Sequence, residues 1–152
     1  MLSALPHVLV TGSSRGIGAA IADALDGRAR YVGHSSRPAP GRVAADLSDP
    51  LGAERLWSEA LRLLDGRIDV LVNNAGVFEP APVDAALTDW QAAWGRTMQI
   101  NLQAAADLCR RAVLHWRERG TGGRIVNIAS RAAYRGDSPA HWHYAASKAG
   151  MV

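Results

Sequence analysis

Short apolar runs alternate along the chain with longer segments in which apolar residues recur at helical spacing. Five short runs are predicted strands: His7–Thr11, Arg30–His34, Arg42–Ala45, Ile68–Val72 and Arg124–Ser130. Between them, residues 19–25, 50–64 and about 97–119 carry the spacing of amphipathic helices. Strands that alternate with helices indicate a parallel sheet with helices on both faces. We therefore predict a single α/β domain over residues 1–152.

Local signals mark where several of these segments begin. Pro50 suits the first turn of the second helix, and Thr88 is the predicted N-cap of a helix that includes Trp90 and Trp94. Pro80 and Pro82 indicate a loop after the fourth strand. A last helix is expected from about residue 140, after Pro139.

Composition and charge exclude several classes of protein. No apolar run approaches the length of a membrane span, and the first residues lack the pattern of a secretory signal. The formal net charge is +3, but the arginines are scattered, so a nucleic-acid partner is not expected. The single cysteine, Cys109, fits a reducing compartment. We expect a cytoplasmic protein with no membrane or nucleic-acid partner.

The segment TGSSRGIG, Thr11 to Gly18, stands between the first strand and the first helix. Gly12, Gly16 and Gly18 permit a tight turn and a close approach of a ligand to the backbone. The free N–H groups at the start of the helix then favour an anion such as a pyrophosphate. The spacing predicts a Rossmann-type, doubly wound parallel sheet that binds a dinucleotide, although a plain glycine-rich turn would look the same.

The end of the second strand indicates which dinucleotide is bound. An acidic residue there binds the ribose 2′-hydroxyl of NAD, whereas an arginine suits the 2′-phosphate of NADP. Here the segment reads GHSSRPAP, with Arg37 and no acid, and Arg15 in the glycine loop can reach the same phosphate. NADP is therefore the expected cofactor, with NAD as the alternative and two plain surface arginines as the structural alternative.

Further polar residues follow the remaining strands. Asn73 to Gly76 (NNAG) and the pair Asp46 and Leu47 stand at carboxyl ends of predicted strands, where ligands bind in such sheets. Asn101 is unusual inside a helix: it is either a surface residue or a residue that holds a kink or a water.

Tyr144 and Lys148 are four residues apart on the last helix and therefore share one face. Lys148 is the only lysine among 17 basic residues, and a compact ammonium beside a phenol can handle protons. Tyr134 has no such partner. His141 and His143 lack the ligand cluster of a metal site and are expected to border a substrate cleft.

TGSSRGIG, NNAG, Asn101, Ser130 and YAASK, in this order, resemble the short-chain dehydrogenase/reductases, and the resemblance covers nearly all of the chain. It implies hydride transfer between NADP(H) and a small-molecule carbonyl or alcohol, with Tyr144 as acid or base and Ser130 bound to the carbonyl oxygen. Asn101 would support a water relay, and Lys148 would bind the nicotinamide ribose and lower the pKa of Tyr144. The implied cofactor-binding residues are Gly12, Ser14, Arg15, Gly16, Ile17, Gly18, Arg37, Asp46, Leu47, Asn73, Ala75, Gly76, Tyr144 and Lys148.

Members of this family continue well past the lysine of this motif. The sequence therefore resembles the N-terminal part of a longer enzyme, whose fifth strand would here be an apolar sheet edge and whose substrate-covering segment is absent. Two classes of function follow: an oxidoreductase, in which a homo-oligomer is common, or a non-catalytic nucleotide-binding or interaction module. We expect weak cofactor binding and little turnover from these 152 residues alone.

Overall fold

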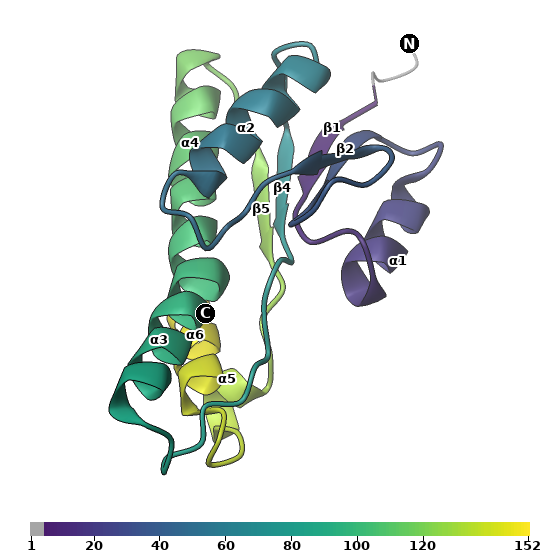
Figure 1. The fold of residues 1–152 in the computed structure, drawn as a ribbon. Coiled ribbons are helices and arrows are strands. Elements are labelled where there is room, and N and C mark those ends of the chain that lie inside the picture. Colours follow the sequence, from purple (N-terminus) through teal and green to yellow (C-terminus); the bar gives the residue numbers. More distant parts are fainter. Residues whose placement is uncertain (1–4) are drawn as a thin grey trace.

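The computed structural model describes residues 5–152, and its five strands form one parallel sheet in the order β3-β2-β1-β4-β5 (Figure 1). The first four residues, part of the segment in which no secretory signal is expected, lie outside the described residues. The strands are β1 (His7–Val10), β2 (Arg30–Ser35), β3 (Arg42–Ala44), β4 (Val70–Asn73) and β5 (Arg124–Asn127). The order reverses direction at β1, as in a doubly wound Rossmann-type sheet. The predicted fold class is confirmed.

The helices lie on both faces of this sheet. They are α1 (Gly16–Leu25), α2 (Gly52–Leu63), α3 (Leu87–Met98), the π-helical segment η1 (Gln99–Gln103), α4 (Ala104–Glu118), α5 (Ala132–Arg135) and α6 (Trp142–Met151). Helix α1 covers one face of the sheet, whereas α2 and α4 cover the other (Figure 1). Each face of the sheet therefore needs its own set of apolar side chains.

Successive strand residues supply those two sets, because their side chains point to opposite faces. Leu9 and Leu71 belong to the larger core beneath α2 and α4, together with the fully buried Trp57. Val8 and Val10 belong to the smaller core beneath α1. This explains why the strands read as continuous apolar runs in the sequence.

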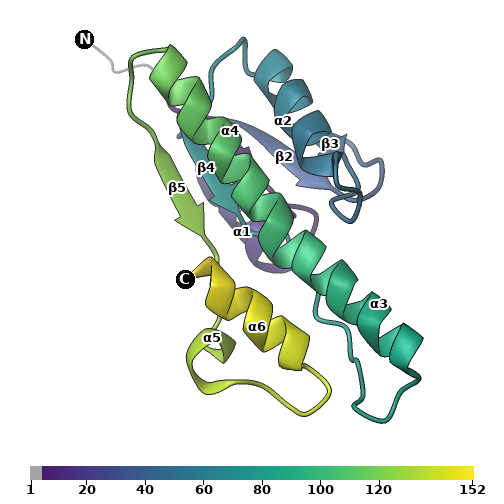
Figure 2. The ribbon, with the colours of Figure 1, turned by 90° about the vertical axis from the view of Figure 1, so that its left-hand side faces the viewer.

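Two predicted features of the helices are wrong. Thr88 is not an N-cap, because α3 already begins at Leu87 and no side chain caps it. No new helix begins near residue 97 either: α3, η1 and α4 follow one another as a single long helical rod (Figure 2). The expected sheet edge is confirmed, since β5 ends the strand order and Val126 is 44% exposed.

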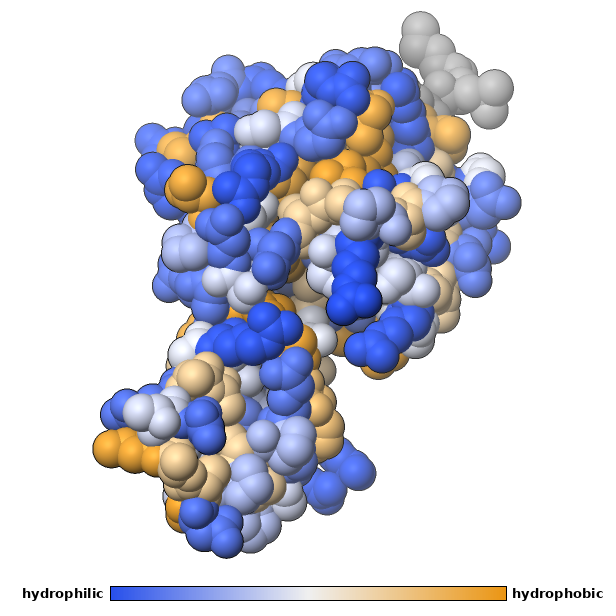
Figure 3. Space-filling view, in the orientation of Figure 1, coloured by the Kyte–Doolittle hydropathy of each residue, from blue (hydrophilic) through white to orange (hydrophobic). Residues whose placement is uncertain are grey.

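Helices α3, α5 and α6 form a helical lobe beyond the carboxyl ends of the strands (Figures 1 and 2). A backbone hydrogen bond from Ala81 N to Ala140 O, 2.7 Å long, ties the segment after β4 to the segment before α6. The space-filling view shows a narrower waist between this lobe and the sheet (Figure 3). Within residues 5–152, no helix is long and apolar enough to span a membrane.

Candidate active site

The glycine loop between β1 and α1 packs its backbone directly against neighbouring backbone. Gly12 has φ of 63°, and a Cβ there would lie 2.7 Å from Cα of Ala75. A Cβ on Gly18 would lie 2.1 Å from the carbonyl oxygen of Gly12. Glycine is therefore required at both positions, at Gly12 by conformation and contact and at Gly18 by contact alone.

Thr11 and Asn74 fasten this loop to the end of β4. The Thr11 hydroxyl oxygen accepts hydrogen bonds from the N–H groups of Asn74, at 3.0 Å, and Ala75, at 2.9 Å. The Asn74 side-chain amide donates to the carbonyl oxygens of Thr11, at 3.1 Å, and Gly12, at 2.9 Å. The two strand ends at which the sheet order reverses are therefore held in a fixed relation.

A cavity of about 420 Å³ opens at these strand ends. Its lining residues are Gly12, Ser14, Arg15, Gly16, Ile17, His34, Ser35, Ser36, Ala45, Asp46, Leu47, Asn74, Ala75, Gly76, Val77, Arg96 and Ile100. Helix α1 begins beside it without a side-chain cap and without an acidic residue in its first turn. An open helix N-terminus next to a glycine cradle fits the pyrophosphate of a dinucleotide.

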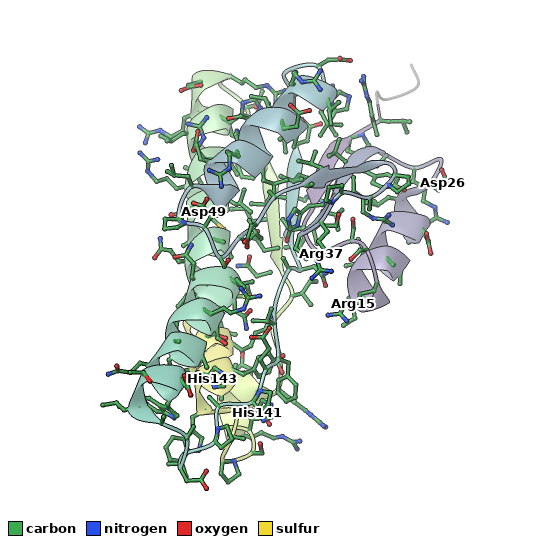
Figure 4. All side chains as sticks on the ribbon, in the orientation of Figure 1. Arg15, Asp26, Arg37, Asp49, His141 and His143 are labelled. Atoms are coloured by element: carbon green, nitrogen blue, oxygen red, sulfur yellow. The ribbon has the colours of Figure 1, made fainter. Side chains whose placement is uncertain are left out.

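Nine of the predicted cofactor-binding residues line this cavity, and five do not. Gly18 lies beneath the loop, as described above. The Asn73 side chain donates to Asn127 Oδ1, at 2.9 Å, and to Cys109 Sγ, at 3.2 Å, so it links β4 to β5 and α4. Arg37 is exposed in the loop after β2, and Figure 4 shows it on the same side of the molecule as Arg15. Tyr144 and Lys148 lie on α6.

His34 is the most informative lining residue that the sequence did not predict. It is 3% exposed, its Nδ1 accepts the N–H of Gly12 at 3.0 Å, and its Nε2 lies 2.9 Å from the carbonyl oxygen of Ala45. Donation to that carbonyl requires the proton on Nε2, so the ring is neutral with Nδ1 free to accept. Burial lowers the pKa of His34, which favours this neutral form.

Asp46 lies at the rim of the cavity with one oxygen already occupied. Its Oδ1 accepts hydrogen bonds from the Ser48 hydroxyl, at 2.6 Å, and from the Ser48 N–H, at 2.9 Å. These bonds, the side-chain one first, hold the pKa of Asp46 below its usual range. The carboxylate is therefore ionised at neutral pH, and its other oxygen can accept a hydrogen bond from a ligand.

Asn101 is fully buried in the π-helical segment and is not a surface residue. Its Oδ1 accepts the N–H of Val77 at 2.8 Å, and its Nδ2 donates to the Val77 carbonyl at 3.0 Å and to Ser147 Oγ at 3.1 Å. The side chain thus joins the segment after β4 to α6. The alternative in which Asn101 holds an irregularity in the helix agrees with its position in η1.

Lys148 lies between Asn101 and the end of β5. It is 5% exposed, and its Nζ donates to the carbonyl oxygen of Ile128 at 2.9 Å. Burial lowers its pKa. Its Nζ also lies 5.9 Å from the ring centroid of Tyr144, within the range of a cation–π contact. The lysine therefore stands beside the phenol, as the four-residue spacing predicts.

Gly76 connects the cavity to these groups. A Cβ on Gly76 would lie 3.4 Å from Asn101 Oδ1 and 3.7 Å from Lys148 Nζ, and Gly76 itself lines the cavity. Ser130, the other predicted catalytic residue, follows β5, and its Oγ accepts the N–H of Ala132 at 3.2 Å. The structure therefore places a single glycine, Gly76, between the cavity and the side chains of Asn101 and Lys148.

The helical lobe contains a group of aromatic rings, of which Phe78 contacts Tyr144. Phe78 stacks on His141 with centroids 3.9 Å apart and meets Tyr144 edge-on at 4.7 Å. His143 is fully buried near Trp94, at a centroid distance of 5.8 Å, so it packs inside the lobe and does not border a cleft. Figure 4 shows both histidines well away from Arg15 and Arg37. Tyr134 is 79% exposed.

Comparisons of sequence agree with this geometry. The family model described as short chain dehydrogenase matches residues 6–152. A D-threitol dehydrogenase from Mycolicibacterium smegmatis is 37% identical, over 95% of this chain and 59% of that protein. A sorbitol dehydrogenase from Cereibacter sphaeroides is 33% identical, over 95% of this chain and 59% of that protein. The chain thus spans about 59% of the length of these curated relatives.

Solved structures share the fold. An NADH-dependent reductase A1-R′ complexed with NAD superimposes with a TM-score of 0.83 at 27% identity, over 95% of this chain and 68% of that one. A short chain dehydrogenase from Mycobacterium smegmatis gives a TM-score of 0.82 at 31% identity, over 97% of this chain and 66% of that one. By sequence and by fold, the chain belongs to the short-chain dehydrogenase family.

Proposed function

We propose that the protein is an NADP(H)-dependent oxidoreductase that interconverts a carbonyl and an alcohol. The observation that carries this proposal is the position of Gly76, which lines the cavity at the strand ends and whose added Cβ would lie 3.4 Å from Asn101 Oδ1 and 3.7 Å from Lys148 Nζ. A dinucleotide in that cavity would supply or accept the hydride. The two curated relatives are named as dehydrogenases of threitol and sorbitol, which are polyols. These names favour small alcohols or carbonyls as substrates.

The cavity offers a group for each part of the cofactor. The N-terminus of α1 and the backbone around Gly12 and Gly16 suit the pyrophosphate. The free oxygen of Asp46 suits an amino group of the adenine. Arg15 lines the cavity, and Arg37 follows β2 in the segment GHSSRPAP, which contains no carboxylate; this favours a 2′-phosphate and hence NADP. The solved relative with NAD bound makes NAD the alternative.

In this proposal, Tyr144 exchanges the proton with the carbonyl or alcohol oxygen, and Ser130 donates a hydrogen bond to that oxygen. Lys148 lies one helical turn from Tyr144, with its Nζ 5.9 Å from the centroid of the tyrosine ring. Within residues 5–152, the buried Lys148 Nζ donates to one carbonyl, that of Ile128, so it retains two N–H donors for the cofactor ribose or for a water beside Asn101.

The experiment compares Tyr144→Phe with the wild type, in the protein as its gene encodes it. We expect kcat for carbonyl reduction with NADPH to fall by about a hundredfold or more, because the acid–base group is lost. NADPH should still raise the Tm of both proteins, and by more than NADH does. Tyr134→Phe, which changes the exposed phenol of α5, is the matched control and should retain full activity.

Two results would count against the proposal. Turnover in Tyr144→Phe close to that of the wild type would remove the tyrosine from the reaction. A wild-type protein that binds NADPH but reduces no carbonyl would instead be a nucleotide-binding module.

A further inference from the structure

A second cavity, of about 390 Å³, lies after β5 and includes Ser130 in its wall. The remaining lining residues are Arg131, Ala132, Arg135, Gly136, Asp137 and Ser138. They belong to α5 and to the turn that follows it, where Gly136 has φ of 73°. The cavity shares no lining residue with the one at the glycine loop, and the proposed function uses only its Ser130.

The charged groups of this cavity are two arginines and one aspartate. Within residues 5–152, neither Arg131 nor Arg135 has a carboxylate within 4.0 Å, in contrast to Arg96, which pairs with Glu79 at 3.3 Å. Asp137 accepts the N–H of Ser138 at 2.7 Å through Oδ1, so this oxygen faces its own turn. Two guanidinium groups thus outweigh one partly occupied carboxylate, and the cavity is electropositive.

The position of the cavity relates it to the reacting groups. Helix α5 packs against α6, which carries Tyr144, and Ser130 belongs both to the wall and to the proposed catalytic set. Because Ser130 forms part of the wall that Arg131 and Arg135 also line, a substrate bound to the Ser130 hydroxyl would adjoin the cavity of the two arginines.

We propose that this cavity binds an oxyanion of the substrate, a carboxylate or a phosphate, through Arg131 and Arg135. A guanidinium group offers a planar pair of donors that matches such an anion and is always charged. Among the small alcohols and carbonyls of the proposed function, the substrates are then the anionic ones: oxo acids and hydroxy acids, or their phosphate counterparts. This inference rests on the proposed function, because it assigns the substrate class of the same site.

The test measures binding, so that it does not depend on turnover. Calorimetry with the NADP⁺-saturated protein, as its gene encodes it, compares 4-oxopentanoate with its neutral analogue 4-oxopentanamide, because the oxidised cofactor cannot reduce either ketone. We expect the carboxylate to bind about fivefold to tenfold more tightly, and this preference to shrink as salt is raised. Arg131→Gln and Arg135→Gln should each reduce the preference, and the double variant should abolish it. Arg117→Gln, an exposed arginine on α4, is the matched control and should leave it unchanged.

The outcomes separate this inference from the proposed function. Equal binding of acid and amide, binding of neither, or a preference that survives in the double variant would overturn the inference. If Arg117→Gln reduced the preference for the carboxylate as much as Arg131→Gln or Arg135→Gln does, the inference would also be overturned, because the preference would then reflect the overall charge of the protein. A protein that shows the arginine-dependent preference but reduces neither compound would retain the anion site and lose the proposed function.

Discussion

His34 joins three segments of the nucleotide cavity through one neutral imidazole ring. Its Nδ1 accepts the Gly12 N–H, its Nε2 contacts the Ala45 carbonyl, and its backbone N–H bonds to Ser13 Oγ at 3.1 Å. A proton on Nδ1 would break the hydrogen bond from the Gly12 N–H, because two N–H donors would then face each other. The glycine loop is therefore sensitive to the protonation state of a residue that lies outside it.

The lowered pKa of His34 predicts a loss of stability in acid. Because the folded pKa lies below the unfolded value, the unfolded state binds more protons, and stability falls as pH drops below about 6.5. The loss is about 1.4 kcal/mol for each unit by which folding lowers the pKa. The pKa values of His115 and His143 are also lowered by burial, so they add to the same loss.

His34→Asn should reduce the difference in Tm between pH 8 and pH 5, measured by thermal unfolding, because one of these three groups no longer titrates. An unchanged pH dependence in His34→Asn would show that the histidine contributes nothing to acid sensitivity.

Two helical glycines show that the surroundings of a residue decide whether a substitution stabilises or destabilises its helix. Gly18 in α1 has backbone of the glycine loop at 2.1 Å from its would-be Cβ, whereas Gly95 in α3 has no atom within 4 Å. Both lie in helices, where alanine is intrinsically better than glycine by about 0.5–1 kcal/mol. The same substitution should therefore have opposite effects at the two sites.

Gly95→Ala should raise the free energy of unfolding by about 0.5–1 kcal/mol, since only the helix propensity changes. Gly18→Ala should lower it by about 1–3 kcal/mol, because the methyl group forces α1 away from the loop, and should weaken NADPH binding as well. Chemical denaturation and NADPH titration of the two variants measure both effects. Equal stability of Gly18→Ala and wild type would show that α1 can shift without cost.

The elements themselves were largely predictable, because strand burial and helix periodicity leave strong local patterns. The failures are a helix start that differs by one residue and side chains whose partners lie far away in the sequence. Thr88 has the chemistry of a cap, yet α3 begins one residue earlier and uses no side-chain cap. Asn101 was visibly odd in the sequence, but its partners Val77 and Ser147 are 24 and 46 residues away. His34 belongs to the predicted second strand, and only the structure shows that its ring lines the cavity.

At the scale of the whole molecule, the sheet and the helical lobe differ in how they are supported. The sheet has apolar cores on both faces, and Leu9 and Leu71 are completely buried. The lobe is joined to the sheet through the narrower waist in Figure 3. The buried side chains of Asn101 and Lys148 connect α6 to the segments after β4 and β5. Cooperative opening of the lobe should therefore cost less free energy than unfolding of the sheet.

Hydrogen exchange of the 152-residue chain tests this difference. Amides of α5 and α6 should exchange faster than those of β1 and β4, which should exchange only through global unfolding. Asn101→Ala should accelerate exchange in α6 further, because Ser147 and the Val77 backbone lose their shared partner, while exchange in β1 and β4 changes much less. Gln103→Ala, an exposed residue of the same π-helical segment, is the matched control. Uniform exchange across sheet and lobe in the wild type would show a single cooperative unit, and Tyr144 and Lys148 would then be as firmly held as the glycine loop.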